Sequence, residues 1–133
     1  MAHNRILSTG VLVRDPASFN AHVEVVNLNP IDMHTVKVEI FDWGVDQLWN
    51  DPKPVPVNPS GPTTIGPHTN QTFIALIDQS TTQPTQNLSH YEIRITLPRD
   101  KDLVINCFAI EAGGRIIEVN TVRHRELVEV VLV

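Results

Sequence analysis

Residues 91–97 read Tyr-Glu-Ile-Arg-Ile-Thr-Leu, and this stretch decides the fold. Apolar side chains occupy every odd position, and polar or charged side chains occupy every even position. This period of two is that of a β-strand, whose successive side chains point to opposite faces of a sheet. We therefore expect an antiparallel strand with one face in the core and the other face, including Glu92, in water.

Segments on both sides of this strand have related patterns. Residues 36–40 read Val-Lys-Val-Glu-Ile, so Lys37 and Glu39 should face solvent while the apolar residues face a core. We expect the remaining strands at Ile6–Val13, His22–Leu28, Gln71–Ile77, Leu103–Glu111, Ile116–Val119 and Glu126–Val133. No helical stripe of ten residues interrupts them.

Three local features refine this pattern. The alternation in the second of these strands slips at Val25-Val26, which predicts a β-bulge. Ala112-Gly-Gly-Arg115 has the glycines that a tight hairpin turn requires. Residues 50–69 carry six prolines, which a central strand does not tolerate, so this segment should be a surface excursion or a sheet edge.

The composition agrees with an all-β protein. Val, Ile and Thr make up 40 of the 133 residues, and β-branched side chains favour strands over helices. Eight or nine short strands predict a single antiparallel β-sandwich of jelly-roll or Greek-key type. We expect residues 9–133 to form this domain and residues 1–8 to form a short N-terminal arm.

Charge and motifs argue against several functions. The net charge of −5, without a run of Lys or Arg, makes nucleic acid an unfavourable partner. The six histidines include no His-x-His pair, and neither Gly-x-Ser-x-Gly nor a phosphate-binding loop occurs, so we expect no enzyme, no metal and no cofactor. Cys107 lies in an apolar run and should be a small buried side chain.

Two further expectations concern the setting of the protein. The N-terminal residues do not fit a signal peptide, so we expect synthesis in the cytoplasm without one. No apolar run approaches the length needed to cross a bilayer, so we expect no membrane partner.

The two ends of the chain predict self-assembly. A strand reached within six residues of the start can pair with an exposed sheet edge of a neighbour, and Val130-Val-Leu-Val133 could offer such an edge. The candidate assembly residues are Ile6, Leu7, Val11, Val13, Val130, Val131, Leu132 and Val133. The edges near Val36–Ile40 and Glu126–Val133 are candidate receivers. Alternatively, both ends pair inside one sandwich.

A binding module is the alternative function. Trp43 and Trp49 flank Gly-Val-Asp-Gln-Leu beside the proline-rich segment, and exposed aromatic residues are a common means of holding sugars or partner proteins. The other interpretation is that one Trp fills the core and the other covers the proline-rich loop.

Four segments carry a resemblance to a known group of proteins. Residues 1–13 (Met-Ala-His-Asn-Arg-Ile-Leu-Ser-Thr-Gly-Val-Leu-Val), 36–43, 90–98 and 120–128 resemble small proteins of endospore-forming bacilli. A short arm followed by a sandwich is also similar in organisation to the jelly-roll subunits of endospore appendages, which polymerise by strand complementation. The resemblance implies a structural subunit of a spore-surface layer or fibre, with other copies of itself, and other surface proteins, as partners.

One departure from those subunits affects the expected assembly. The appendage subunits carry cysteines in the arm, whereas residues 1–20 here contain none. Any polymer of this chain should therefore be held by edge pairing and apolar packing rather than by disulfides.

Overall fold

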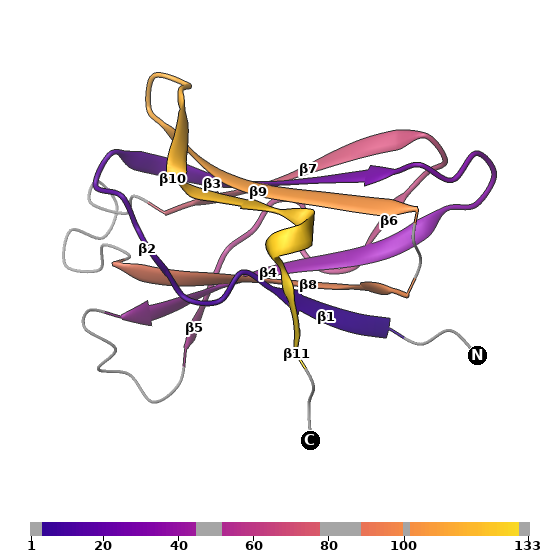
Figure 1. Cartoon of the computed structure of the whole chain (residues 1–133), viewed down its shortest axis with the longest axis horizontal. Helices are drawn as coiled ribbons and strands as arrows, with labels where there is room; N and C mark the ends of the chain where they lie inside the picture. The colour runs from indigo at the N-terminus through magenta and orange to yellow at the C-terminus, as the bar shows by residue number, and fades with distance from the viewer. Residues whose placement is uncertain (1–3, 45–51, 78–88, 100–101, 131–133) are drawn as a thin grey trace.

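The computed structural model describes residues 4–44, 52–77, 89–99 and 102–130, which form two antiparallel sheets packed face to face (Figure 1). The elements are β1 (Asn4–Ser8), β2 (Leu12–Val13), β3 (Ser18–Asn27), β4 (His34–Gly44), β5 (Lys53–Val55), β6 (Thr63–Ile65), β7 (Thr69–Leu76), β8 (His90–Pro98), β9 (Leu103–Glu111), β10 (Ile116–Arg123), the short 3₁₀ turn η1 (His124–Glu126) and β11 (Val128–Val130). The predicted all-β sandwich is confirmed. No helix in these ranges is long and apolar enough to span a membrane.

The seven-stranded sheet has the order β11-β1-β8-β4-β5. Two of its rows are built from pairs of short strands, because β2 continues along β8 beyond β1 and β6 continues along β4 beyond β5. The proline-rich segment thus supplies β5 and β6, in agreement with the predicted edge. The four-stranded sheet has the order β10-β9-β3-β7.

The core lies between the two sheets and is filled as the alternation predicts. On β8, Tyr91, Ile93, Ile95 and Leu97 are at most 1% exposed. Phe73 on β7 and Ile105 on β9 meet them from the other sheet and are equally buried. Cys107 is also fully buried, as expected, and burial raises the pKa of its thiol to about 12.

The predicted β-bulge at Val25-Val26 is wrong. Residues 20–27 of β3 pair with β7 and β9 in an unbroken register. The pattern slips because the inward position belongs to Asn27, whose amide is fully buried and donates hydrogen bonds to the backbone oxygens of Ile65 (3.2 Å) and Gly66 (3.1 Å). A satisfied polar side chain therefore stands where the pattern favoured an apolar one.

The prediction that Val36–Ile40 lies at a free edge is also wrong. These residues belong to β4, which pairs with β8 on one side and with β5 and β6 on the other. Only residues 37–39 lie between the two short strands.

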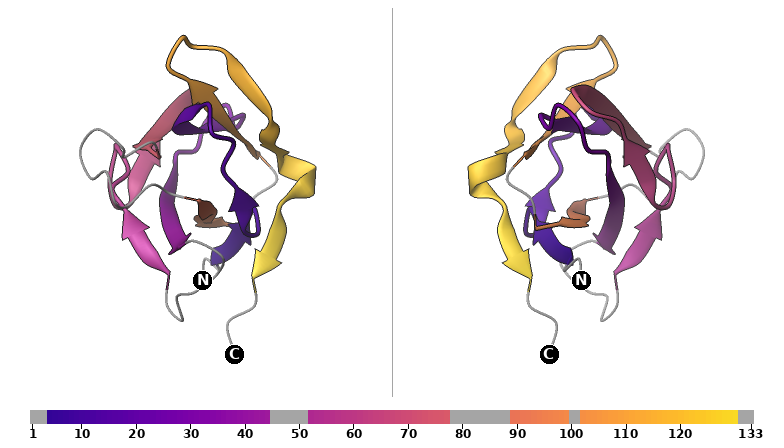
Figure 2. Two further views of the ribbon diagram at one scale, coloured as in Figure 1. Left: turned by 90° about the vertical axis from the view of Figure 1, so that its left-hand side faces the viewer. Right: turned by 90° about the vertical axis from the view of Figure 1, so that its right-hand side faces the viewer.

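The chain changes sheets for the last time at η1. β10 ends beside β9, and β11 then joins β1 in the seven-stranded sheet. Figure 2 shows this yellow segment running down one side of the sandwich. The C-terminal segment therefore covers one side of the domain, beside the connection from β2 to β3.

Candidate functional site

The edge formed by β11 is held by few contacts in the described fold. This strand pairs with β1 through three residue pairs, Ile6 with Val130, Leu7 with Glu129 and Ser8 with Val128. By comparison, β1 pairs with β8 through five. β11 contains no fully buried side chain, and Leu127 before it is only partly buried against the core. The salt bridge from Arg99 to Glu129, at 2.8 Å, is exposed enough to add little stability.

The predicted assembly residues fall into four groups. Leu7 is 4% exposed and belongs to the core of its own chain, while Ile6 and Val130 are half-buried partners across the β1–β11 pairing. In one chain, therefore, both ends pair within one sandwich. Val131, Leu132 and Val133 lie outside the described residues.

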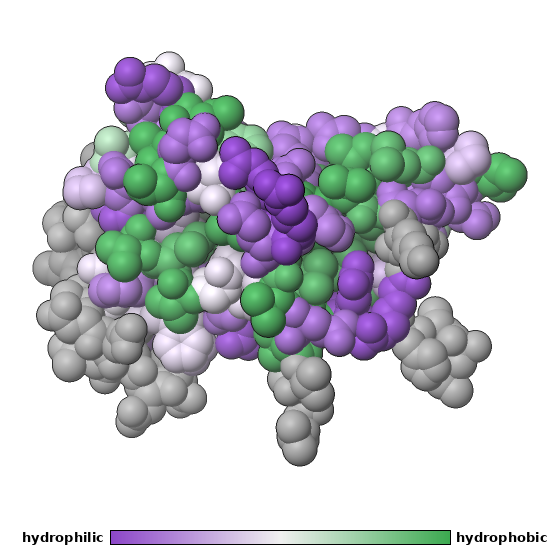
Figure 3. Space-filling model, viewed as in Figure 1, coloured by the Kyte–Doolittle hydropathy of each residue, from purple (hydrophilic) through white to green (hydrophobic). Residues whose placement is uncertain are grey.

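Val11 and Val13 belong to a larger apolar surface. Exposed apolar side chains gather on the side of the molecule that the C-terminal segment closes, over β2, β10 and β11 (Figure 3). We call this the apolar side. Its members are Val11, Val13, Ile116, Val119 and Val128, and each is at least 43% exposed. Exposed apolar surface concentrated on one side is typical of an interaction surface.

A bulge in β10 makes one part of the apolar side protrude. The β9–β10 register jumps between Ile117, opposite Ala109, and Val122, opposite Cys107, so residues 118–121 bulge out of the sheet. Val119 at this bulge is 73% exposed.

Asn120 fixes the bulge to the strand connection that passes it. Its side chain is 2% exposed. Its Nδ2 donates to the Val13 oxygen at 2.8 Å, and its Oδ1 accepts from Asp15 N at 3.0 Å and from Ser18 Oγ at 3.1 Å. The residues around Val13 and Val119 are thereby held together, although they are about a hundred positions apart in sequence.

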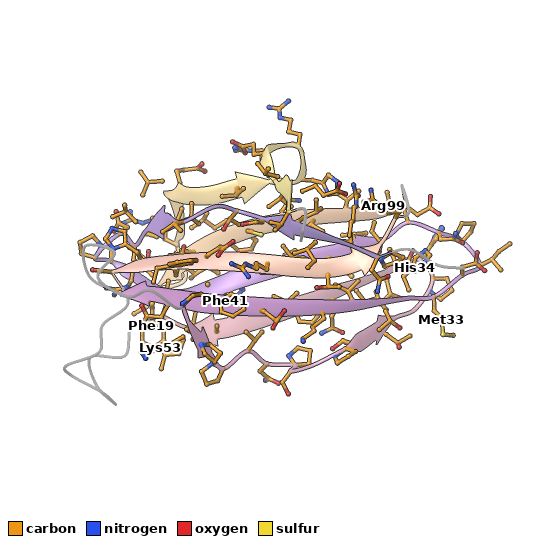
Figure 4. All side chains as sticks on the ribbon, turned by 90° about the horizontal axis from the view of Figure 1, so that it is seen from below. Phe19, Met33, His34, Phe41, Lys53 and Arg99 are labelled. Carbon is orange, nitrogen blue, oxygen red and sulfur yellow. The ribbon has the colours of Figure 1, made fainter. Side chains whose placement is uncertain are left out.

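The second candidate surface is the outer face of the seven-stranded sheet. Figure 4 views this face, with Phe41 on β4 near one end and His34 and Met33 near the other. Near the Phe41 end, the carboxylate of Glu92 accepts hydrogen bonds from Ser8 Oγ (2.5 Å), Trp43 Nε1 (3.0 Å) and Arg94 Nε (3.0 Å). The Arg94 guanidinium also lies over the Phe41 ring, 4.8 Å from its centroid.

The expectation that Glu92 faces water is wrong. It does lie on the outer face, but it is only 5% exposed. Burial alone would raise the pKa of Glu92, yet the hydrogen bonds from Arg94, Ser8 and Trp43 and the charge of Arg94 outweigh it and lower that pKa. Glu39 on the same face is only half-buried, and its Oε2 lies 3.5 Å from Lys37 Nζ.

Trp43 lies away from the groove on this face, although the start of the proline-rich segment pairs beside it at Lys53 and Asp42. A groove of about 440 Å³ lies on this face near the start of β4, lined by Asn4, Met33, Lys37, Pro62, Thr96 and Pro98. Trp43 lies near the opposite end of β4, six residues beyond Lys37, or about 20 Å at the usual rise per residue. Its indole N–H is already bonded to Glu92. Trp49 lies outside the described residues.

The described residues bring no three His, Cys, Asp or Glu side chains together as a metal site would require. A search against protein-family models, curated proteins and solved structures found no match to this chain. Function is therefore inferred from the two surfaces described above.

Proposed function

We propose that this chain is a non-enzymatic structural protein that assembles with copies of itself by exchanging strand β11. In this assembly β11 of one subunit pairs with β1 of the next, in the register that a single chain makes with itself. The observation that carries this proposal is the weak attachment of β11 by three residue pairs and no fully buried side chain.

The proposal assigns the exchange to β11 rather than to the N-terminal arm. β1 has Leu7 in the core and five residue pairs to β8. Removal of β1 would therefore leave a cavity at Leu7 and would also break the pairing with β8. Removal of β11 exposes the edge of β1 and little else. An unpaired edge of this kind is a ready template for a strand from another chain.

The apolar side supplies the second contact of the proposed assembly. It includes Val128 on β11 itself, so a subunit held by an exchanged β11 would approach Val119 on β10. Burying a Val side chain contributes about 1.5 kcal/mol or more. Exchange of β11 replaces strand pairs within one chain by the same pairs between two chains, so it adds no new pairing. Contact between apolar sides would supply the additional affinity.

We further propose a spore-surface layer or fibre as the setting. This part rests on the resemblance of residues 1–13, 36–43, 90–98 and 120–128 to proteins of endospore-forming bacilli. Since Cys107 is fully buried, the proposed assembly is held without disulfides.

The oligomeric state tests this proposal. We expect sedimentation velocity of the full chain to show oligomers that increase with concentration. Val119→Lys should weaken the association by about tenfold, because it puts a charge on the apolar side. Leu28→Lys is the matched control: this residue is also exposed, at 54%, but follows β3 away from the apolar side, and its replacement should leave association unchanged. A monomer at every concentration would refute the proposal.

A further inference from the structure

His124 stands at the point where the C-terminal segment leaves the four-stranded sheet. The β9–β10 ladder ends at the pair of Asn106 and Arg123, and His124 is the next residue. Its Nδ1 accepts the backbone N–H of Ile105 on β9 at 3.0 Å. Because Nδ1 is the acceptor, the imidazole is neutral in this arrangement. The His124 side chain thus adds one hydrogen bond to β9 beyond the last pair of the β9–β10 ladder.

The charges around His124 oppose its protonation. Burial lowers the pKa of His124 from its ordinary value, and the positive charge of Arg5 on β1 lowers it further. Nε of Arg5 is itself buried with no hydrogen-bond partner among the described residues. Residues 103–107 of β9, the strand packed against η1, contain no charged side chain.

The neighbouring acidic groups are engaged elsewhere. Glu126 in the same turn accepts the Arg123 backbone N–H at 2.9 Å and lies 3.8 Å from the Arg123 guanidinium. Glu129 on β11 pairs with Arg99 from the end of β8, and Arg125 adds another positive charge to the turn. The positive charge of a protonated His124 would therefore lie near carboxylates that are already paired with arginines.

Protonation would reverse the hydrogen bond that ties His124 of η1 to Ile105 of β9. A proton taken from solvent onto Nδ1 converts the acceptor into a donor, so that two N–H groups, those of His124 and Ile105, would face each other. The imidazolium would also repel Arg5. Both effects push η1 away from β1 and β9. Beyond η1, the described part of β11 is held by three residue pairs to β1 and the exposed Arg99–Glu129 salt bridge.

We propose that His124 is an acid-sensitive latch whose protonation releases η1 and β11 from their own domain and frees β11 to pair with a second copy. This inference deepens the proposed function and rests on it for the identity of the partner. The release should occur below pH of about 6.5, the ordinary value for an imidazole.

Nuclear magnetic resonance of the dilute full chain, titrated with acid, tests the latch. We expect the Ile105 amide shift to follow the titration of the His124 ring. We expect the cross-strand contacts between Ile6 and Val130 to disappear with the same midpoint. If His124 titrates while these contacts persist, the latch is wrong.

Three variants make the test specific. His124→Asn places an uncharged acceptor, Oδ1, near the position of Nδ1 and should keep β11 paired throughout. His22→Asn is the control: burial also lowers the pKa of His22, but this residue lies on β3, where its ring stacks on Phe108 with 5.5 Å between centroids. It should leave the transition unchanged. Should His124→Asn fail to fold, Arg5→Gln provides a further test: it should raise both midpoints together, and midpoints that separate would overturn the proposal.

Sedimentation above and below the midpoint separates the latch from the proposed function. Loss of the β1–β11 contacts without any oligomer at either pH supports the latch and refutes assembly by exchange. Oligomers that form equally at both pH values, with the contacts unchanged, support assembly and refute the latch.

Discussion

Trp43 Nε1 donates a hydrogen bond to Glu92 Oε1 over 3.0 Å and so joins β4 to β8 on the outer face of the seven-stranded sheet. Ser8 on β1 bonds the other oxygen of the same carboxylate. A single side chain thereby connects three neighbouring strands. Because this face also presents β1, the strand that receives β11, the network helps to keep the proposed receiving edge rigid.

Glu92→Gln should lower the free energy of unfolding by about 1.5–3 kcal/mol at neutral pH, since it removes the charge from hydrogen bonds made to a carboxylate. Urea unfolding measures this change. The control is Glu39→Gln on the same face, where the contact with Lys37 is half-exposed and its loss should cost under about 1 kcal/mol.

The contribution of Glu92 should depend on pH in a defined direction. Its pKa in the folded protein is below the ordinary 4.5, so the unfolded chain binds the proton first as the pH falls. The stabilisation is complete above pH 4.5 and is lost as the pH falls through the lower folded-state pKa. The difference between wild type and Glu92→Gln should therefore shrink in acid, and a constant difference would contradict the role of the charge.

Trp43→Phe should cost about 1 kcal/mol, because it keeps an aromatic ring and removes the indole donor. Combined with Glu92→Gln, it should give a double-mutant coupling energy of about 0.5 kcal/mol or more, as expected for groups in one network. Strict additivity in urea unfolding would show that the Trp43–Glu92 bond contributes nothing.

Asn120→Ala should destabilise the domain by about 1–3 kcal/mol, because it removes hydrogen bonds to the part-buried backbone of Val13 and Asp15 and to the buried hydroxyl of Ser18. Thermal unfolding measures the loss. Asn106→Ala is a matched control, since Asn106 is exposed on the neighbouring β9 and should tolerate the same change within about 0.5 kcal/mol. Equal effects of the two substitutions would contradict the bridging role of Asn120.

Cys107 should react with a thiol reagent only after unfolding. Its side chain is fully buried, and its pKa of about 12 leaves almost no thiolate at neutral pH. We expect labelling of the folded protein to be slow and to follow the rate of unfolding in denaturant. Rapid labelling of the native protein, or a covalent dimer through Cys107 under oxidising conditions, would contradict this structure.

The sequence was sufficient to predict the sandwich and the core side of its clearest strand. The alternation at residues 91–97 places Ile93 and Ile95 inward. The tight β9–β10 turn requires a residue with positive φ, and Gly114 supplies it with a φ of 93°. Both signals are local, so no knowledge of partner strands is needed to interpret them.

The candidate site was less predictable because its contacts are long-range. Alternation places Glu92 on the outer face, but its exposure depends on Ser8, 84 residues away, and on Trp43, 49 residues away. The same limit applies to the β10 bulge, where Asn120 meets residues more than a hundred positions earlier. Strand order decides these contacts, and a single sequence does not contain that information in any local pattern.

Paired cysteines test the central claim of β11 exchange most directly. One protein carries Ile6→Cys and a second carries Val130→Cys, at positions directly opposite each other in the β1–β11 register. The two are mixed and oxidised. The account predicts a disulfide between the two different chains, while a mixture of Ile6→Cys with Val119→Cys, whose residues are not paired, should give far less. If the Ile6→Cys and Val130→Cys chains stay unlinked, although one chain carrying both substitutions closes its own disulfide, then β11 does not leave its domain and the proposed assembly is wrong.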